Sequence, residues 1–178
     1  MNIGTDRSFE DVRAAHDAVL IATGVYKARD ISVPGVGLGG VVPALDYLTA
    51  SNRKSLGDDV AAFESGELNA EGRNVVVVGG GDTAMDCVRT AIRQNAKSVS
   101  CLYRRDRANM PGSQREVANA EEEGVVFKWL SAPQAFLGDN RVRAVQARKF
   151  ILASQMQRVG RCRRSLTGQP TKLRLIWS

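Results

Sequence analysis

Apolar positions change their period repeatedly along the chain, and the sharpest change falls at Val75–Val78. Four consecutive β-branched residues there predict a parallel strand that is central in its sheet and buried on both faces. Three glycines, Gly79–Gly81, follow at once. From Asp82 to Gln94 apolar residues then recur at helical spacing, which predicts an amphipathic helix. This stretch therefore indicates a strand, a tight turn and a helix in immediate succession.

Similar changes of period predict the other elements. A second strand at 98–103 follows the helix, and a third at 125–130 is reached through another helix, which Ser113-x-x-Glu116 opens as a capping box. This alternation is typical of α/β proteins with a Rossmann-like parallel sheet. The remaining expected elements are helices at 8–15, 43–49 and 60–65, a buried strand at 17–24, a hairpin of 135–137 with 141–147, and a mobile connection over 51–72.

Composition and length narrow the class of protein. The 178 residues can hold one domain with a sizeable core, and 43% hydrophobic with 25% charged residues is ordinary for a soluble globular protein. No apolar run approaches the roughly 20 residues of a membrane span. The segment Met1–Arg7 lacks the apolar core of a signal peptide. We therefore expect a cytoplasmic protein without a membrane partner.

The net charge of +6 is unevenly distributed. Residues 141–178 hold ten Lys or Arg and no acid, so they carry +10, whereas residues 1–140 carry −4. A basic tail can bind nucleic acid, but these charges are scattered and only Phe150 and Trp177 could stack on bases. We therefore expect no nucleic-acid partner. The alternative, a basic-tail nucleic-acid binder, predicts a steeply salt-dependent affinity.

The cysteines and the single histidine do not form a reactive group. Cys87, Cys101 and Cys162 are widely spaced and form no C-x-x-C pair, which argues against a zinc or iron–sulfur site in the chain. Cys87 and Cys101 fall in a predicted helix and strand, so we expect small core residues. His16 precedes a predicted strand and is expected at a helix end or on the surface, and a catalytic role is the less favoured alternative. No metal site and no catalytic acid, base or nucleophile is identified.

The glycines after the valine strand carry the chemistry of a dinucleotide site. Gly79-x-Gly81-x-x-Ala84 fits the fingerprint in which one glycine makes the turn, the next admits a pyrophosphate, and a small residue packs the helix on the strand. The phosphates would then meet free N–H groups at the positive end of a helix. Asp82 could cap this helix while facing away from the ligand. The expected loop comprises Gly79, Gly80, Gly81, Asp82, Thr83 and Ala84.

A second glycine pattern, Gly35-x-Gly37-x-x-Gly40, is rejected as a nucleotide loop. The run before it is short and ends in Pro34, which cannot continue a central strand. We expect a surface loop that leads into the helix beginning near Pro43.

Two arginines indicate which nucleotide is bound. An NAD site carries an acid about 20 residues after the glycines, where it accepts the ribose 2′-hydroxyl. Arg104 and Arg105 occupy that place, with Arg107 close by. Paired guanidinium donors suit a 2′-phosphate, which an acid would repel. The sequence therefore predicts NADPH in preference to NADH, and the alternative is a solvated arginine cluster.

Four segments together resemble one family. They are Asp17–Gly24, Ala44–Leu48, Val75–Cys87 and Leu102–Ser113, and the resemblance covers residues 1–149. The stretches Gly-Gly-Gly-Asp-Thr-Ala-Met-Asp-Cys and Tyr-Arg-Arg-Asp-Arg-Ala-Asn-Met-Pro are the most specific. These segments are similar to the small (β) subunit of NADPH-dependent glutamate synthase, among the pyridine nucleotide–disulphide-type oxidoreductases.

The resemblance implies hydride transfer from NADPH to FAD. Electrons then pass through iron–sulfur clusters to an FMN-bearing large subunit, the implied partner, which forms glutamate from 2-oxoglutarate and glutamine-derived ammonia. Carried over by position, Gly79, Gly81 and Ala84 match the pyrophosphate loop, and Arg104 and Arg105 match the 2′-phosphate site. Thr23 and Gly24 match the turn beside the flavin domain.

The family's amino-terminal iron–sulfur region and its FAD-binding glycine unit are not found in this sequence. We therefore expect an internal fragment that holds FAD weakly or not at all. The alternatives are a non-catalytic NADP-binding or partner-docking fragment and another NADPH-dependent flavin reductase of the superfamily. The expected units are a remnant of the FAD-binding domain at 1–36, a connecting segment at 37–72, an NADPH-binding domain at 73–149, and a basic irregular tail at 150–178 that leaves the family's reading frame near Lys149.

Overall fold

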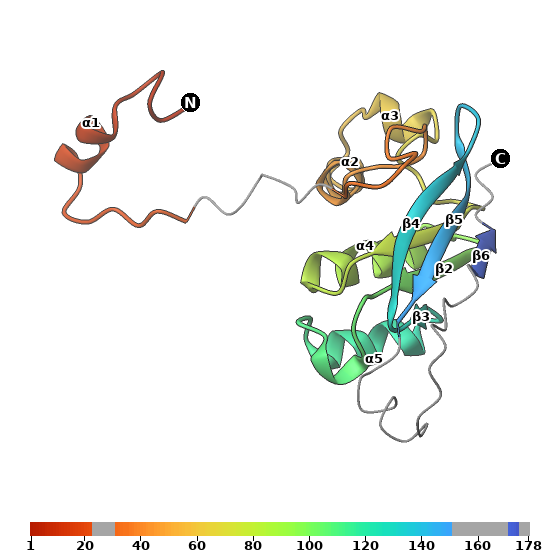
Figure 1. Cartoon of the computed structure of the whole chain (residues 1–178). Helices are drawn as coiled ribbons and strands as arrows, with labels where there is room; N and C mark the ends of the chain where they lie inside the picture. Colours follow the sequence, from red (N-terminus) through yellow and green to blue (C-terminus); the bar gives the residue numbers. More distant parts are fainter. Residues whose placement is uncertain (23–30, 151–170, 175–178) are drawn as a thin grey trace.

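A three-stranded parallel sheet forms the centre of the molecule (Figure 1). The computed structural model describes residues 1–22, 31–150 and 171–174. The strands, in the order β1-β2-β3, are β1 Asn74–Val78, β2 Ser98–Leu102 and β3 Val126–Lys128. The predicted α/β class with a Rossmann-like parallel sheet is confirmed. Among the described residues β2 lies between β1 and β3 and β1 is at the edge of the sheet, so for this part of the chain the prediction that the valine strand is central is wrong.

The strand register places three carboxyl ends at one edge of the sheet. Val78 pairs with Leu102, and Leu102 pairs with Lys128. Residues that follow these strands therefore meet at the same edge, as they do in open α/β sheets that bind ligands there.

Both faces of the parallel sheet are covered. Helices α4 (Asp82–Arg93) and α5 (Gln114–Glu122) pack on one face through a core that includes Val75 and Val77. A second core, which includes Val76, lies on the other face under an antiparallel hairpin. The valines of β1 thus alternate between two cores, and each is half-buried.

The hairpin consists of β4 (Ser131–Gly138) and β5 (Val142–Lys149), as the sequence predicts, although both strands are longer. A further strand, β6 (Thr171–Arg174), pairs antiparallel with β5. This strand lies in the tail for which no regular structure is predicted, so that prediction is wrong for residues 171–174.

The rejected glycine pattern packs against this hairpin. Phe136 N–H donates to the Pro34 carbonyl (2.8 Å), and a Cβ at Gly35 would lie 2.1 Å from the Phe136 carbonyl oxygen. Gly39 exchanges backbone bonds with the hairpin turn, donating to Asn140 (3.0 Å) and accepting from Val142 (2.9 Å). The loop therefore seals the second core and does not begin a nucleotide-binding turn.

Helices α2 (Ala44–Ser55) and α3 (Ala61–Glu64) precede the sheet, and α2 is longer than predicted. The Gln94 side chain joins this region to the end of α4. Its Oε1 accepts from Tyr47 Oη and from Ala70 N–H, both at 2.9 Å, and its Nε2 donates to Ser51 (3.0 Å). Tyr47 and Ser51 both lie in α2, so the Gln94 amide fixes this helix beside the end of α4.

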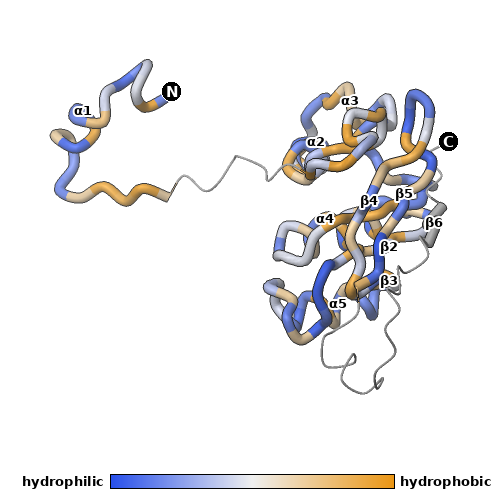
Figure 2. Tube along the Cα trace, in the orientation of Figure 1, coloured by the Kyte–Doolittle hydropathy of each residue, from blue (hydrophilic) through white to orange (hydrophobic). Residues whose placement is uncertain are grey.

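The amino-terminal segment carries α1 (Phe9–Ala14), with Ser8 as the expected N-cap. The buried strand expected at 17–24 is not formed over 17–22, where Leu20 is 89% and Ile21 69% exposed. Figure 2 shows the hydrophobic colour of the chain in this stretch, after α1. No strand in the described part of the chain pairs with this apolar run, so its backbone has no ladder to join. Among the described residues, no helix has the length and apolar character needed to span a bilayer.

Candidate nucleotide-binding site

The turn after β1 is built from three glycines, and the fold restricts the side chain that could stand at each position to a different degree. Gly79 has a φ of 150°, which disfavours a side chain, and its N–H donates to the Leu102 carbonyl (3.1 Å). A Cβ at Gly80 would lie 2.4 Å from the buried Tyr103 ring. Gly81 differs from both, because a Cβ there would meet no atom within 4 Å and its φ of −92° suits any residue. The fold therefore does not demand glycine at 81, and the bare backbone there is open to a ligand.

Free amides line this open side of the turn. The carbonyl of Gly81 accepts from the N–H groups of Ala84 (2.9 Å) and Met85 (3.2 Å), which closes the first turn of α4. The N–H groups of Gly81, Asp82 and Thr83 have no acceptor among the described residues. They lie at the positive end of a twelve-residue helix, where an anion is stabilised.

Ala84 brings the helix close to the turn. It is 7% exposed, and a Cβ at Gly79 would lie 3.3 Å from its methyl group. The two small residues therefore meet with little space between them. This is the close packing that the fingerprint predicts.

Arg104 and Arg105 follow β2 at the same edge of the sheet. Both side chains are exposed, and neither has an ion-pair partner in the described ranges. Arg107, by contrast, pairs with Glu121 at 2.7 Å. The structure thus leaves two adjacent exposed arginines just after β2, the strand that pairs with β1.

The β3–β4 corner fixes the backbone of these arginines. Leu130 N–H donates to the Arg105 carbonyl (3.0 Å), and Ser131 N–H donates to the Tyr103 carbonyl (2.8 Å). Leu130 has a φ of +54°, a left-handed conformation that is strained for a branched side chain. The corner therefore stores local strain while it holds the arginine segment in place.

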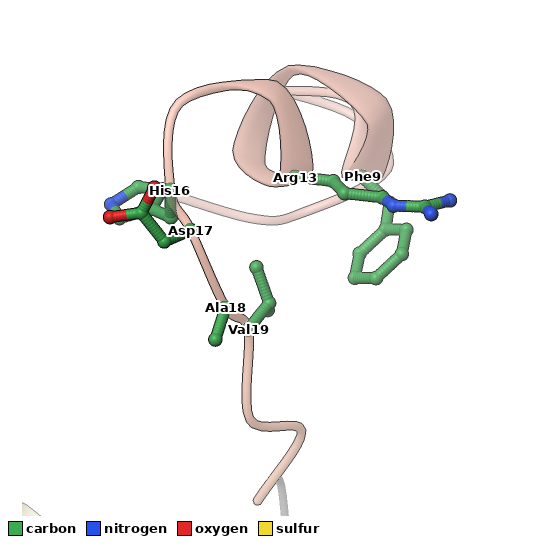
Figure 3. A pocket seen from close by; sticks show the side chains of 6 residues that line it. All are labelled: Phe9, Arg13, His16, Asp17, Ala18 and Val19. Atoms are coloured by element: carbon green, nitrogen blue, oxygen red, sulfur yellow. The ribbon is translucent and has the colours of Figure 1, made fainter.

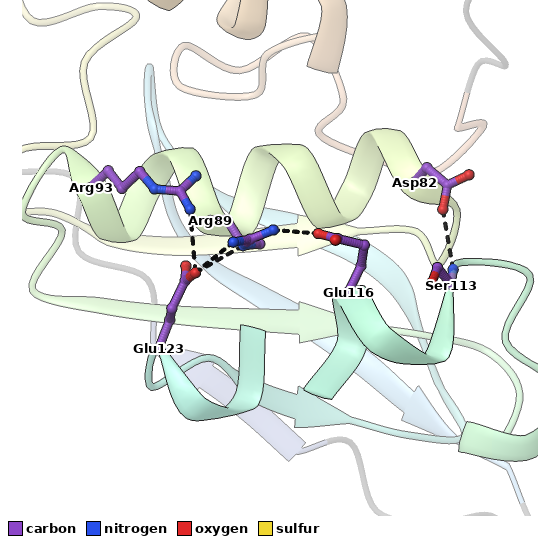
Figure 4. Close-up of polar contacts among 6 residues, drawn as sticks. All are labelled: Asp82, Arg89, Arg93, Ser113, Glu116 and Glu123. Atoms are coloured by element: carbon purple, nitrogen blue, oxygen red, sulfur yellow. Dashed lines mark hydrogen bonds and ion pairs between the residues drawn. The ribbon is translucent and has the colours of Figure 1, made fainter. Parts of the chain in front are cut away.

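The segment Met110–Ser113 lies against the glycine turn, a contact that the sequence does not predict. Gly112 N–H donates to the Gly80 carbonyl (2.9 Å), and Ser113 N–H donates to Asp82 Oδ1 (3.2 Å; Figure 4). The one feature of the sequence that indicates packing here is an apolar residue, Met110, next to Pro111 and Gly112, which end regular structure. Such a signal indicates a packed loop but does not name its partner.

Two capping predictions are wrong. The N-cap of α4 is Gly81, and Asp82 is the first helical residue with its carboxylate directed to Ser113. Ser113 is the N-cap of α5, but its side chain makes no capping bond. Glu116 is drawn instead to Arg89 of α4, so the capping box does not form.

Ion pairs join α4 to α5 further along α4, away from the Asp82–Ser113 contact (Figure 4). Arg89 contacts both Glu116 and Glu123, the latter at 2.8 Å, and Arg93 contacts Glu123 at 3.3 Å. Hydrogen bonding to Arg89 lowers the pKa of Glu123. These pairs give a structural role to part of the acidic run at 121–123, since Glu121 also pairs with Arg107.

The remaining sequence candidates lie apart from the turn or outside the described residues. Burial raises the pKa of the Cys87 and Cys101 thiols to about 12, as expected for core residues. His16 is exposed and borders an open hollow with Phe9 and Arg13 on the amino-terminal segment (Figure 3). No group of three metal-ligating side chains is found among the described residues. Thr23, Gly24 and Cys162 lie outside the described ranges.

Known proteins are similar to this chain in sequence and in fold. The model of the pyridine nucleotide-disulphide oxidoreductase family matches residues 4–161, beyond the 149 residues that the sequence resemblance covers. The chain belongs to this family. It is 68% identical over 150 residues to the glutamate synthase [NADPH] small chain of Azospirillum brasilense, covering 84% of this chain and 31% of that relative. This chain therefore spans about a third of that relative's length.

More distant relatives carry other names. The NADP(+)-dependent formate dehydrogenase subunit beta of Moorella thermoacetica is 37% identical over 139 residues, covering 77% of this chain and 18% of that relative. Among solved structures, Mycobacterium tuberculosis FprA in complex with NADPH matches with a TM-score of 0.62 at 15% identity, covering 94% of this chain and 48% of FprA. A likeness at that identity establishes the fold alone.

Proposed function

We propose that this chain forms the NADPH-binding unit of a glutamate-synthase-type oxidoreductase. One observation supports the proposal: the free amides of Gly81–Thr83 follow β1 and the exposed residues Arg104 and Arg105 follow β2, at the same edge of the sheet. The amides suit a pyrophosphate, and the arginines suit the 2′-phosphate that distinguishes NADPH from NADH.

The main chain of the turn fits the nucleotide in shape as well as in charge. The open space at Gly81 lets phosphate oxygens approach the main chain without meeting a side chain. NADPH, when bound, supplies the hydride, and the chain's own residues bind and orient it. In the complete enzyme we propose FAD as the hydride acceptor and the glutamate synthase large subunit as the partner that uses the electrons for glutamate synthesis. The 68% identity to a glutamate synthase small chain supports this assignment.

A second candidate is an NADPH-dependent reductase with another electron acceptor. The Moorella formate dehydrogenase subunit shares this region at 37% identity, although it is named for a different reaction. The region common to both proteins therefore fits a nucleotide-binding role and leaves the acceptor to other parts of the protein. Glutamate formation by the complete enzyme, assayed with its large subunit, separates the two candidates.

The test of the nucleotide site is calorimetric titration of the whole chain with NADPH and with NADH. We expect tighter binding of NADPH, and in Arg104→Ala/Arg105→Ala a fall of about 10- to 100-fold toward the NADH value, since two charge-assisted contacts are lost. The control is Arg13→Ala/Arg143→Ala, which removes two exposed arginines outside the nucleotide edge. Equal affinities for the two nucleotides, or an equal loss in the control, would refute the assignment.

A further inference from the structure

We infer that Asp82 is a positioning residue whose carboxylate holds the segment Met110–Ser113 against the glycine turn, so that this segment, here named the strap, forms one wall of the phosphate site. The inference rests on the proposed NADPH-binding function of the turn. It assigns Asp82 a role in shaping the site and not in contacting the nucleotide.

Two hydrogen bonds fasten the strap to the turn. Gly112 N–H donates to the Gly80 carbonyl (2.9 Å), and Ser113 N–H donates to Asp82 Oδ1 (3.2 Å). The approach is close, because a Cβ at Gly112 would lie 3.1 Å from the Gly80 carbonyl oxygen and 3.6 Å from the Gly81 carbonyl carbon. The strap therefore covers the Gly80 side of the turn and leaves the Gly81 side open.

The other end of the strap is anchored independently. Tyr103 Oη donates to the Asn109 carbonyl (2.9 Å), and Met110 is 6% exposed within the first core. Asp106 caps the short 3-10 helix η1 (Arg107–Asn109) by accepting from Asn109 N–H (3.0 Å). Loss of the Asp82 contact would thus release only the Ser113 end and leave the segment attached at Met110.

A role confined to the first turn of α4 does not explain why residue 82 carries a negative charge. Gly81 already caps α4, so the helix does not require an acid at its first position. A carboxylate beside three free amides repels a pyrophosphate, which disfavours the proposed ligand. Its compensating contact is with Ser113, the N-cap of α5, where the positive end of a second helix favours a negative charge. The carboxylate therefore links the amino ends of α4 and α5.

Two pairs of variants separate the hydrogen bond from the charge. Asp82→Ala removes the acceptor, whereas Asp82→Asn keeps an acceptor oxygen and removes the charge. Ser113→Pro removes the donor N–H, and the observed φ of −55° suits proline; Ser113→Ala keeps the donor. Asp86→Ala is the control for charge on the same helix, because Asp86 is exposed one turn further along α4.

The experiment measures amide hydrogen exchange at Met110, Gly112 and Ser113, the three strap residues that carry an N–H, in the ligand-free whole chain. NADPH affinity is measured alongside, for variants whose near-UV circular dichroism matches the parent. We expect Asp82→Ala and Ser113→Pro to expose the Gly112 amide at the released end of the strap, while the Met110 amide stays protected. Both variants should weaken NADPH binding about tenfold, since one contact to a charged group is lost. Asp82→Asn should keep parental affinity or exceed it. Ser113→Ala should bind more tightly than Ser113→Pro, and Asp86→Ala should resemble the parent.

Three results would overturn the inference. An exposed strap with unchanged NADPH affinity would show that the strap is not a wall of the site. Equal losses in Asp82→Asn and Asp82→Ala would show that the charge, and not the hydrogen bond, matters. A parent chain with protected strap amides and no NADPH binding would refute the proposed function itself, and with it the role of Asp82 toward the nucleotide.

Discussion

Gly80 and Tyr103 are in such close contact that a Cβ on residue 80 would lie 2.4 Å from two carbon atoms of the ring. Tyr103 is 7% exposed and holds Asn109 through its hydroxyl, so the ring has little freedom to retreat. We expect Gly80→Ala to lower the free energy of unfolding by about 1–3 kcal/mol through overpacking. Urea denaturation of parent and variant measures this loss, and equal midpoints would contradict the prediction.

Gly81→Ala should have the opposite profile. A Cβ at residue 81 meets no atom within 4 Å, so we expect a loss of stability below about 1 kcal/mol, mainly from the poorer N-cap. The added methyl group occupies the space through which a pyrophosphate would approach the amides. NADPH affinity measured by calorimetry should therefore fall at least about tenfold. Parental affinity in Gly81→Ala would exclude close approach of a ligand at this residue.

The Glu123 ion pairs predict a dependence of stability on pH. Because Arg89 lowers the pKa of Glu123, this carboxylate stabilises the fold above its unfolded pKa, and the contribution is lost as pH falls through the lowered folded value. We expect Glu123→Gln to cost about 1 kcal/mol at neutral pH and nothing in acid, where both forms are uncharged. Thermal melts across this range test it. A constant difference at every pH would mean that packing, and not charge, is lost.

The buried cysteines should resist thiol reagents. Burial raises the pKa of Cys87 and Cys101 to about 12, so both thiols stay protonated near pH 8 and lack the reactive thiolate. In a Cys162→Ser chain, which leaves only these two thiols, we expect slow labelling in buffer and rapid labelling of both in urea. Fast labelling of the folded chain would contradict their placement in the core.

The exposed apolar run before residue 23 should affect solubility more than stability. Leu20 and Ile21 are largely exposed, whereas Val88 is fully buried in α4. We expect Leu20→Ser/Ile21→Ser to reduce aggregation, measured by light scattering, with no change in the melting temperature. The contrasting variant Val88→Ser should melt earlier, because it places a hydroxyl in an apolar core. A lower melting temperature in the double variant would show that the run is packed.

Local patterns were sufficient to predict the parallel sheet and the glycine turn. The valine run, the glycines and the helical spacing after Asp82 are contiguous, so short-range periodicity describes them. The position of β1 in the sheet could not be predicted, because strand order depends on which elements are present to pair with it. The four-residue strand β6 is too short for a period to be recognised.

Contacts between distant residues account for the rest. Asp82 and Ser113 are both residue types that cap helices, and no local pattern shows that they bind each other across 31 positions. Glu116 likewise fits a capping box, yet its carboxylate forms an ion pair with Arg89 of another helix. The sequence thus indicates the residue types at the site, while tertiary pairing decides their partners.

The pairing of Gly39 with Asn140 and Val142 has a consequence for synthesis on the ribosome. About a hundred residues separate the loop from the hairpin that covers it, so at about 5–20 residues per second the loop waits roughly 5–20 s for its partner. During that interval the glycine turn, α4 and β2 can already assemble. The second core closes last, and its apolar side chains are the surface that a nascent-chain chaperone would meet.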